Sequence, residues 1–272
     1  MSRDIGAALR ALHRPGDPFI LANAWDAGSA KLLAALGASA IATSSAAHAF
    51  TLGRPDMGLV SRDEALAHAQ DLVAAVNVPV SGDFENGFGE APETVAETVR
   101  LAFEAGLAGI SVEDTALPGD IPYARALAAE RIRAAAAAAR ALPRDFVLVA
   151  RADGVMNGQY DLDEALARLA LFEAAGADCL YVPVPGGIEA QARICASTTL
   201  PVNALVAGDF AEIPRARFAG IGVARLSLGS SLARATHRLI VDAGHDMFER
   251  GDFSRLAHSI TGGEVDALLG KA

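Results

Sequence analysis

The chain has 272 residues, a net charge of −10 at neutral pH and a hydrophobic fraction of 52%. This acidic balance argues against nucleic acid or an anionic membrane as a partner, and no uninterrupted apolar run is long enough to span a bilayer. The first residues lack the long apolar segment of a secretory signal, so we expect a cytoplasmic protein with reduced thiols at Cys179 and Cys195.

Strand-like and helix-like patterns alternate along the chain, beginning with a helix near 4–12. Strands are expected near 19–24, 40–45, 78–83, 109–113, 146–151, 179–184, 201–206 and 222–228. Between them lie helical patterns near 27–36, 62–76, 92–105, 124–141, 162–175, 187–196 and 211–218. A long helix near 230–250 and one or two short helices then lead to residue 272.

This alternation predicts one domain over residues 1–272, a (β/α)8 TIM barrel with an N-terminal helix and a helical C-terminal extension from about 230 to 272. A doubly wound open sheet is the structural alternative. It would need a glycine-rich dinucleotide loop after the first strand, and residues 23–28 do not form one. The extra C-terminal helices exceed what a closed barrel needs, so we expect them to pack against a neighbouring subunit.

Several residues mark the ends of the expected helices. Ser61 and Asp161 precede acidic first turns and offer N-cap oxygens. Gly37, Gly106 and Gly176 each follow a helical pattern and fit glycine C-caps. The short segment around each of these glycines comes just before a strand, as expected for repeated αβ loops.

Three acidic residues stand where neighbouring strands end. Asp83 and Glu85 close the third strand, and Glu113 closes the fourth. Catalytic groups of (β/α)8 barrels gather at the C-terminal ends of the strands. Carboxylate oxygens suit Mg²⁺, with Mn²⁺ as an alternative, and the absence of His and Cys from these turns disfavours zinc. Each acid alone could cap a helix or lie at the surface, but the group favours a metal site, held directly or through water.

Arg151 closes the fifth strand and is a candidate for binding a carboxylate, because a guanidinium can hold one through two parallel bonds. An ion pair with Asp153 or Glu113 is the alternative. The other candidates for substrate contact also lie on the turns or strands of the expected rim. They are Trp25 after the first strand, Ser44, Ser45 and Ala46 after the second, Asp56 in the same long loop, and Asn203 on the seventh strand.

Some chemistries are excluded by residues that the chain lacks. Its only lysines are Lys31 and Lys271, and neither closes a strand, so a Schiff-base aldolase or a pyridoxal-phosphate enzyme is not expected. No Gly-x-x-x-x-Gly-Lys phosphate loop is present. Among the scattered histidines, His48 lies near the expected site, and His237 is interpreted as structural.

Six segments together resemble the isocitrate lyase/phosphoenolpyruvate mutase superfamily, including its 2-methylisocitrate lyase-like and carboxyvinyl-carboxyphosphonate phosphorylmutase-like members. They are Ser44-Ser45-Ala46, Gly53-Arg54-Pro55-Asp56, residues 83–89, Val112-Glu113-Asp114, residues 150–153 and Gly176-Ala177-Asp178. The resemblance implies a barrel whose terminal helix is swapped between the subunits of a homo-oligomer, a tetramer or a dimer. It also implies Mg²⁺ near Asp83, Glu85 and Glu113, and a 2-oxo acid held by Ser44, Ser45 and Arg151 with Asp56 near the reacting atoms.

The chain departs from the superfamily at positions that decide the reaction. Residues 115–123 lack the Lys-Lys-Cys-Gly-His loop of isocitrate and methylisocitrate lyases, and also the lysine and asparagine of phosphonopyruvate-forming mutases. Glu85 replaces the usual second aspartate of the metal motif. Pro183 stands on the sixth strand where several lyases carry glutamate.

These features lead to the hypothesis of a Mg²⁺-dependent lyase that acts on a small 2-oxo dicarboxylic acid through an enolate. Oxaloacetate decarboxylation is preferred, because departing CO₂ leaves the electrons behind and no protein base is needed at the start. Asp56 and Arg151 are the catalytic candidates, with Tyr123 as proton donor, and the loop 115–123 is expected to close over substrate. One alternative is (methyl)isocitrate lyase-like cleavage of a 2-hydroxy carboxylate or phosphonate P–C chemistry. Another is a protein that binds a 2-oxo acid and metal without turnover.

Overall fold

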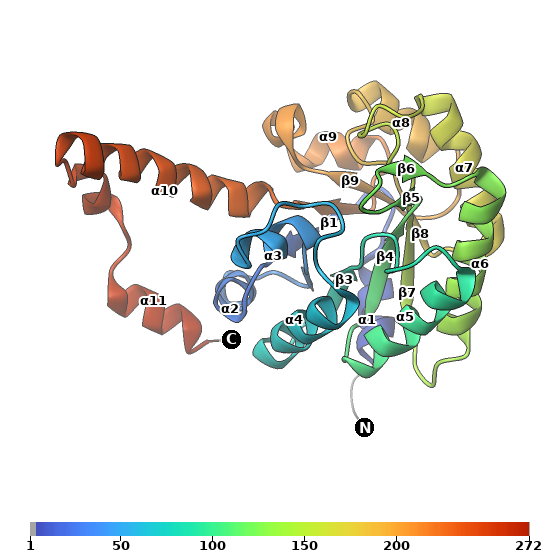
Figure 1. Cartoon of the computed structure of the whole chain (residues 1–272), viewed down its shortest axis with the longest axis horizontal. Helices are drawn as coiled ribbons and strands as arrows, with labels where there is room; N and C mark the ends of the chain where they lie inside the picture. The colour runs from blue at the N-terminus through green and yellow to red at the C-terminus, as the bar shows by residue number, and fades with distance from the viewer. Residues whose placement is uncertain (1–3, 272) are drawn as a thin grey trace.

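A computed structural model describes residues 4–271 and shows a closed barrel of parallel strands at the centre of the molecule (Figure 1). The order around the barrel is β1, β10, β9, β8, β7, β4, β3 and β2. This confirms the predicted (β/α)8 barrel and rules out the open sheet, because β1 pairs with both β10 and β2. The strands are β1 (Phe19–Asn23), β2 (Ile41–Ala42), β3 (Val80–Asp83), β4 (Gly109–Glu113), β7 (Val147–Arg151), β8 (Cys179–Tyr181), β9 (Val202–Leu205) and β10 (Arg225–Ser227).

Helices alternate with the strands and form an outer layer on most of the barrel (Figure 1). They are α1 (Ile5–Leu12), α2 (Ala27–Ala35), α3 (Ser45–Thr51), α4 (Arg62–Ala75), α5 (Pro92–Glu104), α6 (Arg125–Arg140), α7 (Leu162–Ala175), α8 (Ile188–Ala196), α9 (Arg215–Gly220), α10 (Ser231–Arg250) and α11 (Gly262–Leu269). Two short 3₁₀ helices, η1 (Gly208–Glu212) and η2 (Ser254–His258), complete the set.

The predicted helix signals are confirmed. The Ser61 hydroxyl accepts a hydrogen bond from the backbone N–H of Glu64, and the Asp161 carboxylate accepts one from that of Glu164. Gly176 ends α7 in the left-handed conformation with φ of 101°, which a residue with a Cβ adopts only at a cost. The alanine-rich α6 lies between α5 and α7, where its small side chains let the three helices pack closely.

Two elements near the rim were not predicted. The serines expected in a turn instead begin α3, whose N-cap is Ser44. The loop after β4 contains a small antiparallel hairpin, β5 (Thr115–Ala116) and β6 (Ile121–Pro122). Both are short, and elements of this length carry too few apolar positions to produce a readable period.

The inside of the barrel is apolar near the bottom and polar above. The apolar part is a buried cluster that includes Leu9, Leu21, Val147, Val149 and Cys179. The polar part follows one row of paired residues across five adjacent strands. This row runs from Glu113 to Arg151, Tyr181, Asn203 and Arg225. We call it the polar rung. Paired residues of parallel strands face the same side of the sheet. The polar rung therefore places charged and polar side chains from the rim down into the interior of the barrel.

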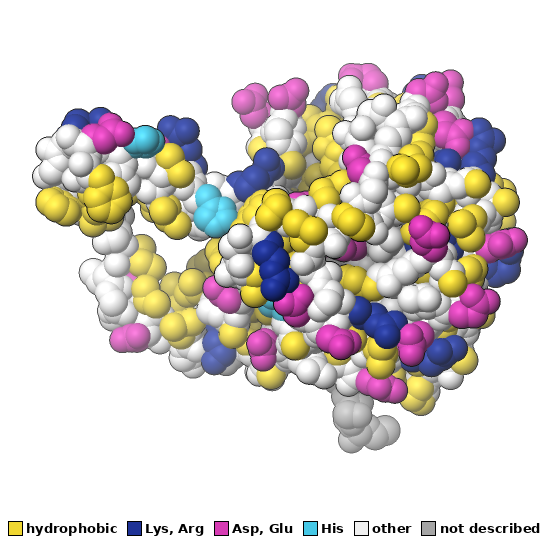
Figure 2. All heavy atoms as spheres, viewed as in Figure 1, with side chains coloured by type: hydrophobic (Ala, Val, Ile, Leu, Met, Phe, Trp, Pro, Cys, Tyr) yellow, Lys and Arg dark blue, Asp and Glu magenta, His cyan; other side chains and the backbone are white. Residues whose placement is uncertain are grey.

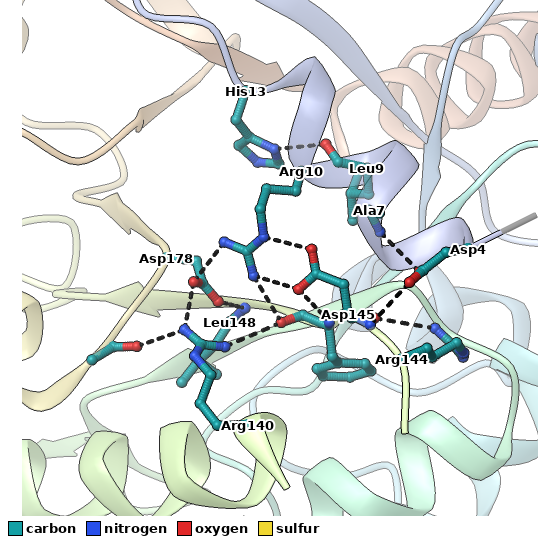
Figure 3. A network of polar contacts seen from close by, with 12 residues as sticks. Asp4, Ala7, Leu9, Arg10, His13, Arg140, Arg144, Asp145, Leu148 and Asp178 are labelled. Carbon is teal, nitrogen blue, oxygen red and sulfur yellow. Dashed lines mark hydrogen bonds and ion pairs between the residues drawn. The ribbon is translucent and has the colours of Figure 1, made fainter. Parts of the chain in front are cut away.

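Helix α1 covers the bottom of the barrel (Figure 1). A Cβ on Gly6 would lie only 1.7 Å from the carbonyl oxygen of Asp145, so glycine is required for the helix to approach this closely. Arg10 leaves the same helix and binds Asp145 through two hydrogen bonds of 2.6 and 2.7 Å and Asp178 through one of 2.7 Å (Figure 3). Arg140 binds the same oxygen of Asp178 at 2.5 Å. We call these four side chains the bottom network.

The C-terminal segment leaves the barrel as an arm (Figure 1). Helix α10 projects from the body, and η2 and α11 return so that α11 contacts α2. Apolar side chains are exposed along this arm, and Figure 2 shows them as hydrophobic patches on its surface. They are Leu239, Ile240, Val241, Phe248, Phe253, Leu256 and Ile260. Of the helices within residues 4–271, none combines the length and the apolar character that crossing a membrane requires.

Candidate functional site

A cavity of about 120 Å³ opens at the C-terminal ends of the strands. Eight of the residues predicted from the sequence line it, namely Ser44, Ser45, Ala46, Asp56, Asp83, Glu85, Glu113 and Arg151. They come from the ends of β2, β3, β4 and β7 and from the long loop between α3 and α4. The remaining lining residues are Met57, Leu117, Met156, Asn157, Tyr181, Leu205, Gly229 and Ser230.

Asp83 lies at the centre of the hydrogen bonds in this cavity. Its Oδ2 accepts bonds from the backbone N–H of Ser45 at 3.0 Å and from the Ser45 hydroxyl at 2.9 Å. Its Oδ1 accepts bonds from Arg151 Nη1 at 2.9 Å and from the Ser111 hydroxyl at 3.3 Å. The start of α3 therefore positions the carboxylate, with the Ser45 N–H at the favourable end of the helix dipole.

Arg151 is shared among three carboxylates. Its Nη1 lies 2.9 Å from Asp83 and 3.0 Å from Glu113, and its other edge grips both oxygens of Asp153 at 3.1 and 2.6 Å. Burial lowers the pKa of Arg151, but the surrounding carboxylates outweigh that effect and hold it well above its usual value. The alternative in which Arg151 pairs with Asp153 or Glu113 is thus observed. Binding a ligand carboxylate remains a prediction.

For the other acids of the cavity, burial outweighs the contacts that favour the charged form. Glu85 accepts a backbone hydrogen bond from Gly58 at 3.2 Å, yet burial raises the pKa of Glu85 to about 7. Burial likewise raises the pKa of Glu113 well above its usual value and raises that of Asp56. The charge of Asp83 adds to all three increases. Glu85 also has φ of 46°, an unusual backbone conformation for a residue with a side chain.

The donor set suits a hard divalent cation. Four carboxylates line the cavity, from Asp56, Asp83, Glu85 and Glu113, against the single guanidinium of Arg151. Nothing else among the lining residues carries positive charge, so a cation would relieve the repulsion that raises their pKa values. Within residues 4–271, no three His, Cys, Asp or Glu side chains form a ready-made metal cluster. The carboxylates therefore fit Mg²⁺ if water completes its coordination, as is usual for this ion.

Trp25 and Tyr123 do not line the cavity. Trp25 lies in a separate surface cavity of about 670 Å³ between α2, α3 and α4, and its carbonyl oxygen is 2.9 Å from His68 Nε2. Tyr123 is buried in the outer core, where its hydroxyl accepts a hydrogen bond from Asn86 at 3.0 Å. The guanidinium of Arg131 lies 4.1 Å from the centre of its ring. The structure therefore brings neither side chain to the acids.

Asn203 is fully buried inside the barrel, below the cavity. Its Oδ1 accepts a hydrogen bond from Arg225 Nε at 2.8 Å, and its Nδ2 donates one to the Ser227 hydroxyl at 2.8 Å. Both ends of the amide are thus bound within the protein. Its predicted contact with a ligand remains untested.

Sequence reasoning missed two residues of the polar rung. Tyr181 ends β8 and lines the cavity, so the rule that found Arg151 at the end of β7 could have found it. Arg225 is the one charged residue in the otherwise apolar segment 223–226, and this pattern indicates a charged side chain with a role inside the barrel. The apolar lining residues Met57, Leu117, Met156 and Leu205 gave no such signal, because their side chains resemble ordinary core.

Two loops meet above the cavity. Leu117, in the loop that holds β5 and β6, lines the cavity together with Met156 and Asn157 from the loop after β7. Asp120 joins the loops, because its carboxylate accepts hydrogen bonds from Asn157 at 2.9 Å and Gln159 at 2.8 Å. These contacts place the loop 115–123 where a cover for the site would lie.

A parallel barrel with acids and an arginine at its C-terminal rim has the arrangement of a TIM-barrel enzyme. The family model described as phosphoenolpyruvate phosphomutase matches residues 9–248. The chain therefore belongs to this family, and the resemblance to the isocitrate lyase/phosphoenolpyruvate mutase superfamily is confirmed.

Three relatives illustrate the match. An uncharacterised protein of Mycobacterium tuberculosis is 33% identical over 264 residues, which cover 95% of this chain and 94% of that protein. The 2,3-dimethylmalate lyase of Eubacterium barkeri is 34% identical over 201 residues, which cover 72% and 68%. A crystal structure from Burkholderia cenocepacia J2315 is 44% identical, covers 97% of this chain and 94% of its own, and superposes with a TM-score of 0.92. The named relatives are lyases and mutases, which supports an enzyme of the carbon–carbon lyase kind.

Proposed function

We propose that the protein is a Mg²⁺-dependent decarboxylase of oxaloacetate or of a close 2-oxo analogue. The observation that carries this proposal is the composition of the cavity. It contains four carboxylates and one arginine, and the residues that line it include no Cys, Lys or His. A relative from Chromohalobacter salexigens, 28% identical over 229 residues, is named oxaloacetate decarboxylase.

Decarboxylation suits this set of residues better than (methyl)isocitrate cleavage does. A tricarboxylate would bring one more negative charge than oxaloacetate to a cavity whose only cation among the lining residues is Arg151. Removing a proton from a hydroxyl would also need a base, for which Asp56 is the one lining carboxylate outside the proposed metal set. Loss of CO₂ needs neither, since the electrons of the broken C–C bond remain on the 2-oxo acid as an enolate.

The chain's own residues have distinct roles in this proposal. Asp83, Glu85 and Glu113 would hold Mg²⁺, which supplies Lewis-acid stabilisation of the developing enolate charge. Ser44, Ser45 and Arg151 would bind the retained carboxylate. Asp56 lines the cavity from the loop between α3 and α4 and would stand near the reacting atoms. The apolar side chains of Met57, Leu117, Met156 and Leu205 line the same cavity and would help to exclude water from the reacting carboxylate.

The test is pyruvate formation from oxaloacetate with Mg²⁺, measured against the rate of the free metal and against Mg²⁺ with Asp83→Ala protein. We expect the wild type to exceed both. Equal rates for the wild type and Asp83→Ala would overturn the assignment. Testing 2-methylisocitrate and phosphonopyruvate in parallel separates decarboxylation from the other reactions of the superfamily.

A second candidate is C–C cleavage of an alkyl-substituted 2-hydroxy acid. The observation in its favour is the apolar wall formed by Met57, Leu117, Met156 and Leu205, which could accept alkyl groups. The 2,3-dimethylmalate lyase relative acts, by its name, on such a compound. Release of a 2-oxo acid from 2,3-dimethylmalate, with no turnover of oxaloacetate, would favour this reading.

We also propose that the protein works as a homo-oligomer that exchanges its C-terminal arms. Ile20 on β1 is 50% exposed although it belongs to a barrel strand, and Leu239, Ile240 and Phe248 are exposed on α10. An apolar helix of a second copy would cover both surfaces, since large exposed apolar patches mark interaction sites. Sedimentation should show a dimer or tetramer, and Ile240→Asp should dissociate it. A wild-type monomer at micromolar concentration would contradict the proposal.

A further inference from the structure

The polar rung continues below the cavity into a second, deeper pocket. This pocket has a volume of about 40 Å³ and shares Asp83, Arg151, Tyr181 and Gly229 with the cavity above it. Tyr181 thus stands at the boundary between the two. Its ring lies 5.1 Å from the guanidinium carbon of Arg151, and only 5% of its surface is exposed.

A directed set of hydrogen bonds ends at Ser227, which lines the deeper pocket together with Tyr181. Arg225 can only donate, so Asn203 must accept through Oδ1. The Asn203 Nδ2 then donates to the Ser227 hydroxyl, so the Ser227 proton is directed away from Asn203 inside the pocket that Tyr181 also lines.

Two guanidinium groups line the deeper pocket together with Tyr181. Arg151 also lines the cavity above it, whereas Arg225 lines only the deeper pocket. Arg225 is buried, and among residues 4–271 its Nη1 has no hydrogen-bond partner and no carboxylate forms an ion pair with it. This unneutralised cation would stabilise negative charge on Tyr181. Burial raises the pKa of Tyr181, so the phenol carries its proton at neutral pH.

We propose that Tyr181 is the catalytic acid that protonates the enolate, and that Asn203, Ser227 and Arg225 are positioning residues which orient it. This inference rests on the proposed decarboxylation. After CO₂ has left, the C2–C3 double bond of the enolate takes the Tyr181 proton at C3 and the carbonyl re-forms, which gives pyruvate. The tyrosinate then regains a proton from solvent water. Positioned general acids of this kind contribute roughly 10²–10⁴-fold.

The experiment follows the reverse of this step, which needs no decarboxylation. In D₂O with Mg²⁺, the wild type should exchange the methyl protons of pyruvate for deuterium, observed by NMR. Tyr181→Phe should lower the exchange rate by about 100-fold or more. Calorimetric binding of oxalate with Mg²⁺ should stay within about 3-fold of wild type, since only a hydroxyl is removed. Ser227→Ala should lower exchange less, by about 10-fold, and should keep the same oxalate affinity.

Two competing acids are tested in the same assay. Tyr123→Phe removes the hydroxyl that lies outside the cavity, and Asp56→Asn removes the loop acid that lies within it. Loss of exchange in either variant while Tyr181→Phe retains it would overturn the assignment. Absence of exchange by the wild type would overturn it as well.

The two proposals fail in different ways. If the wild type does not release CO₂ from oxaloacetate but exchanges pyruvate protons through Tyr181, only the proposed function is wrong. If the wild type decarboxylates and Tyr181→Phe exchanges at the wild-type rate, only the assignment of Tyr181 is wrong. The Phe variant keeps the aromatic ring beside Arg151, so the fold is expected to survive. Asn203→Ser alters the hydrogen bonds that join Arg225 to Ser227 and should change the exchange rate less than Tyr181→Phe does.

Discussion

The two ends of the barrel differ in their balance of positive and negative side chains. At the bottom, Arg10 and Arg140 face Asp145 and Asp178, two cations against two anions (Figure 3). There the hydrogen bonds from Arg10 lower the pKa of Asp145. At the rim, Arg151 alone faces several acids, and burial raises the pKa values of Glu85 and Glu113. The charges of the bottom network are balanced, as expected for a structural role. The rim holds an excess of negative charge, which a bound cation would offset.

Removal of an acid of the rim should have the largest effect on activity. Asp83→Asn should lower kcat/KM by about 10³-fold or more, because a carboxylate proposed to hold the metal is lost. The thermal midpoint of the metal-free protein should change little, since the weaker bonds from Arg151 and Ser45 are offset by reduced repulsion among the acids. Steady-state kinetics and calorimetry on the same sample measure both. A large loss of stability would show that the rim is structural.

The matching change at the bottom is Gly6→Ala. Its Cβ would fall 1.7 Å from the Asp145 carbonyl oxygen, so α1 must shift. We expect a loss of about 3 kcal/mol in the free energy of unfolding and little change in kcat. Urea denaturation provides the measurement. The exposed neighbour Ala7→Ser is the control and should change stability by less than about 0.5 kcal/mol.

Arg10→Met tests the charge of the bottom network without adding bulk. It leaves Asp145 without its bidentate partner, while Arg140 still binds Asp178. We expect a loss of about 2 kcal/mol, which is typical of hydrogen bonds to charged groups. Decarboxylation measured at 25 °C should match that of the wild type. A drop in kcat with unchanged stability would link the bottom to the site.

The two ends of the barrel should also differ in how their acids respond to pH. A carboxylate whose folded pKa lies above its unfolded value stabilises the fold at low pH, and that contribution is lost as the pH rises towards the folded pKa. Glu85, with a folded pKa of about 7, should thus make the metal-free protein lose about 2 kcal/mol between pH 4.5 and 7. Asp145 has the opposite sign, and its contribution disappears only as the pH falls below about 4.

The stabilisation of the protein by magnesium should itself depend on pH. Added Mg²⁺ should raise the thermal midpoint more at pH 7.5 than at pH 5, because the ion competes with the protons that the rim acids hold at low pH. Differential scanning calorimetry with EDTA as the control measures the effect. An equal shift at both pH values would argue against a metal at these carboxylates.

The sequence predicted the fold closely because period, caps and strand ends are local signals. It located the acids and Arg151 because each is the last residue of a strand or lies in the turn that follows. It failed to describe the surroundings of Tyr123, because the hairpin of β5 and β6 turns the chain back towards Asn86. It also could not show the depth of Asn203, since the rung passes from the last residue of β8 to the interior of β9.

One consequence of the polar rung concerns protein engineering. Its five members come from five adjacent strands, one residue from each, at matching register. A deletion of one residue within any of these strands would turn the following side chains to the outer face. Five point substitutions at one level of another parallel barrel would reproduce the register of the rung but not the contacts of Arg151 with Asp83 and Asp153. A transplanted rung would therefore need these partners as well.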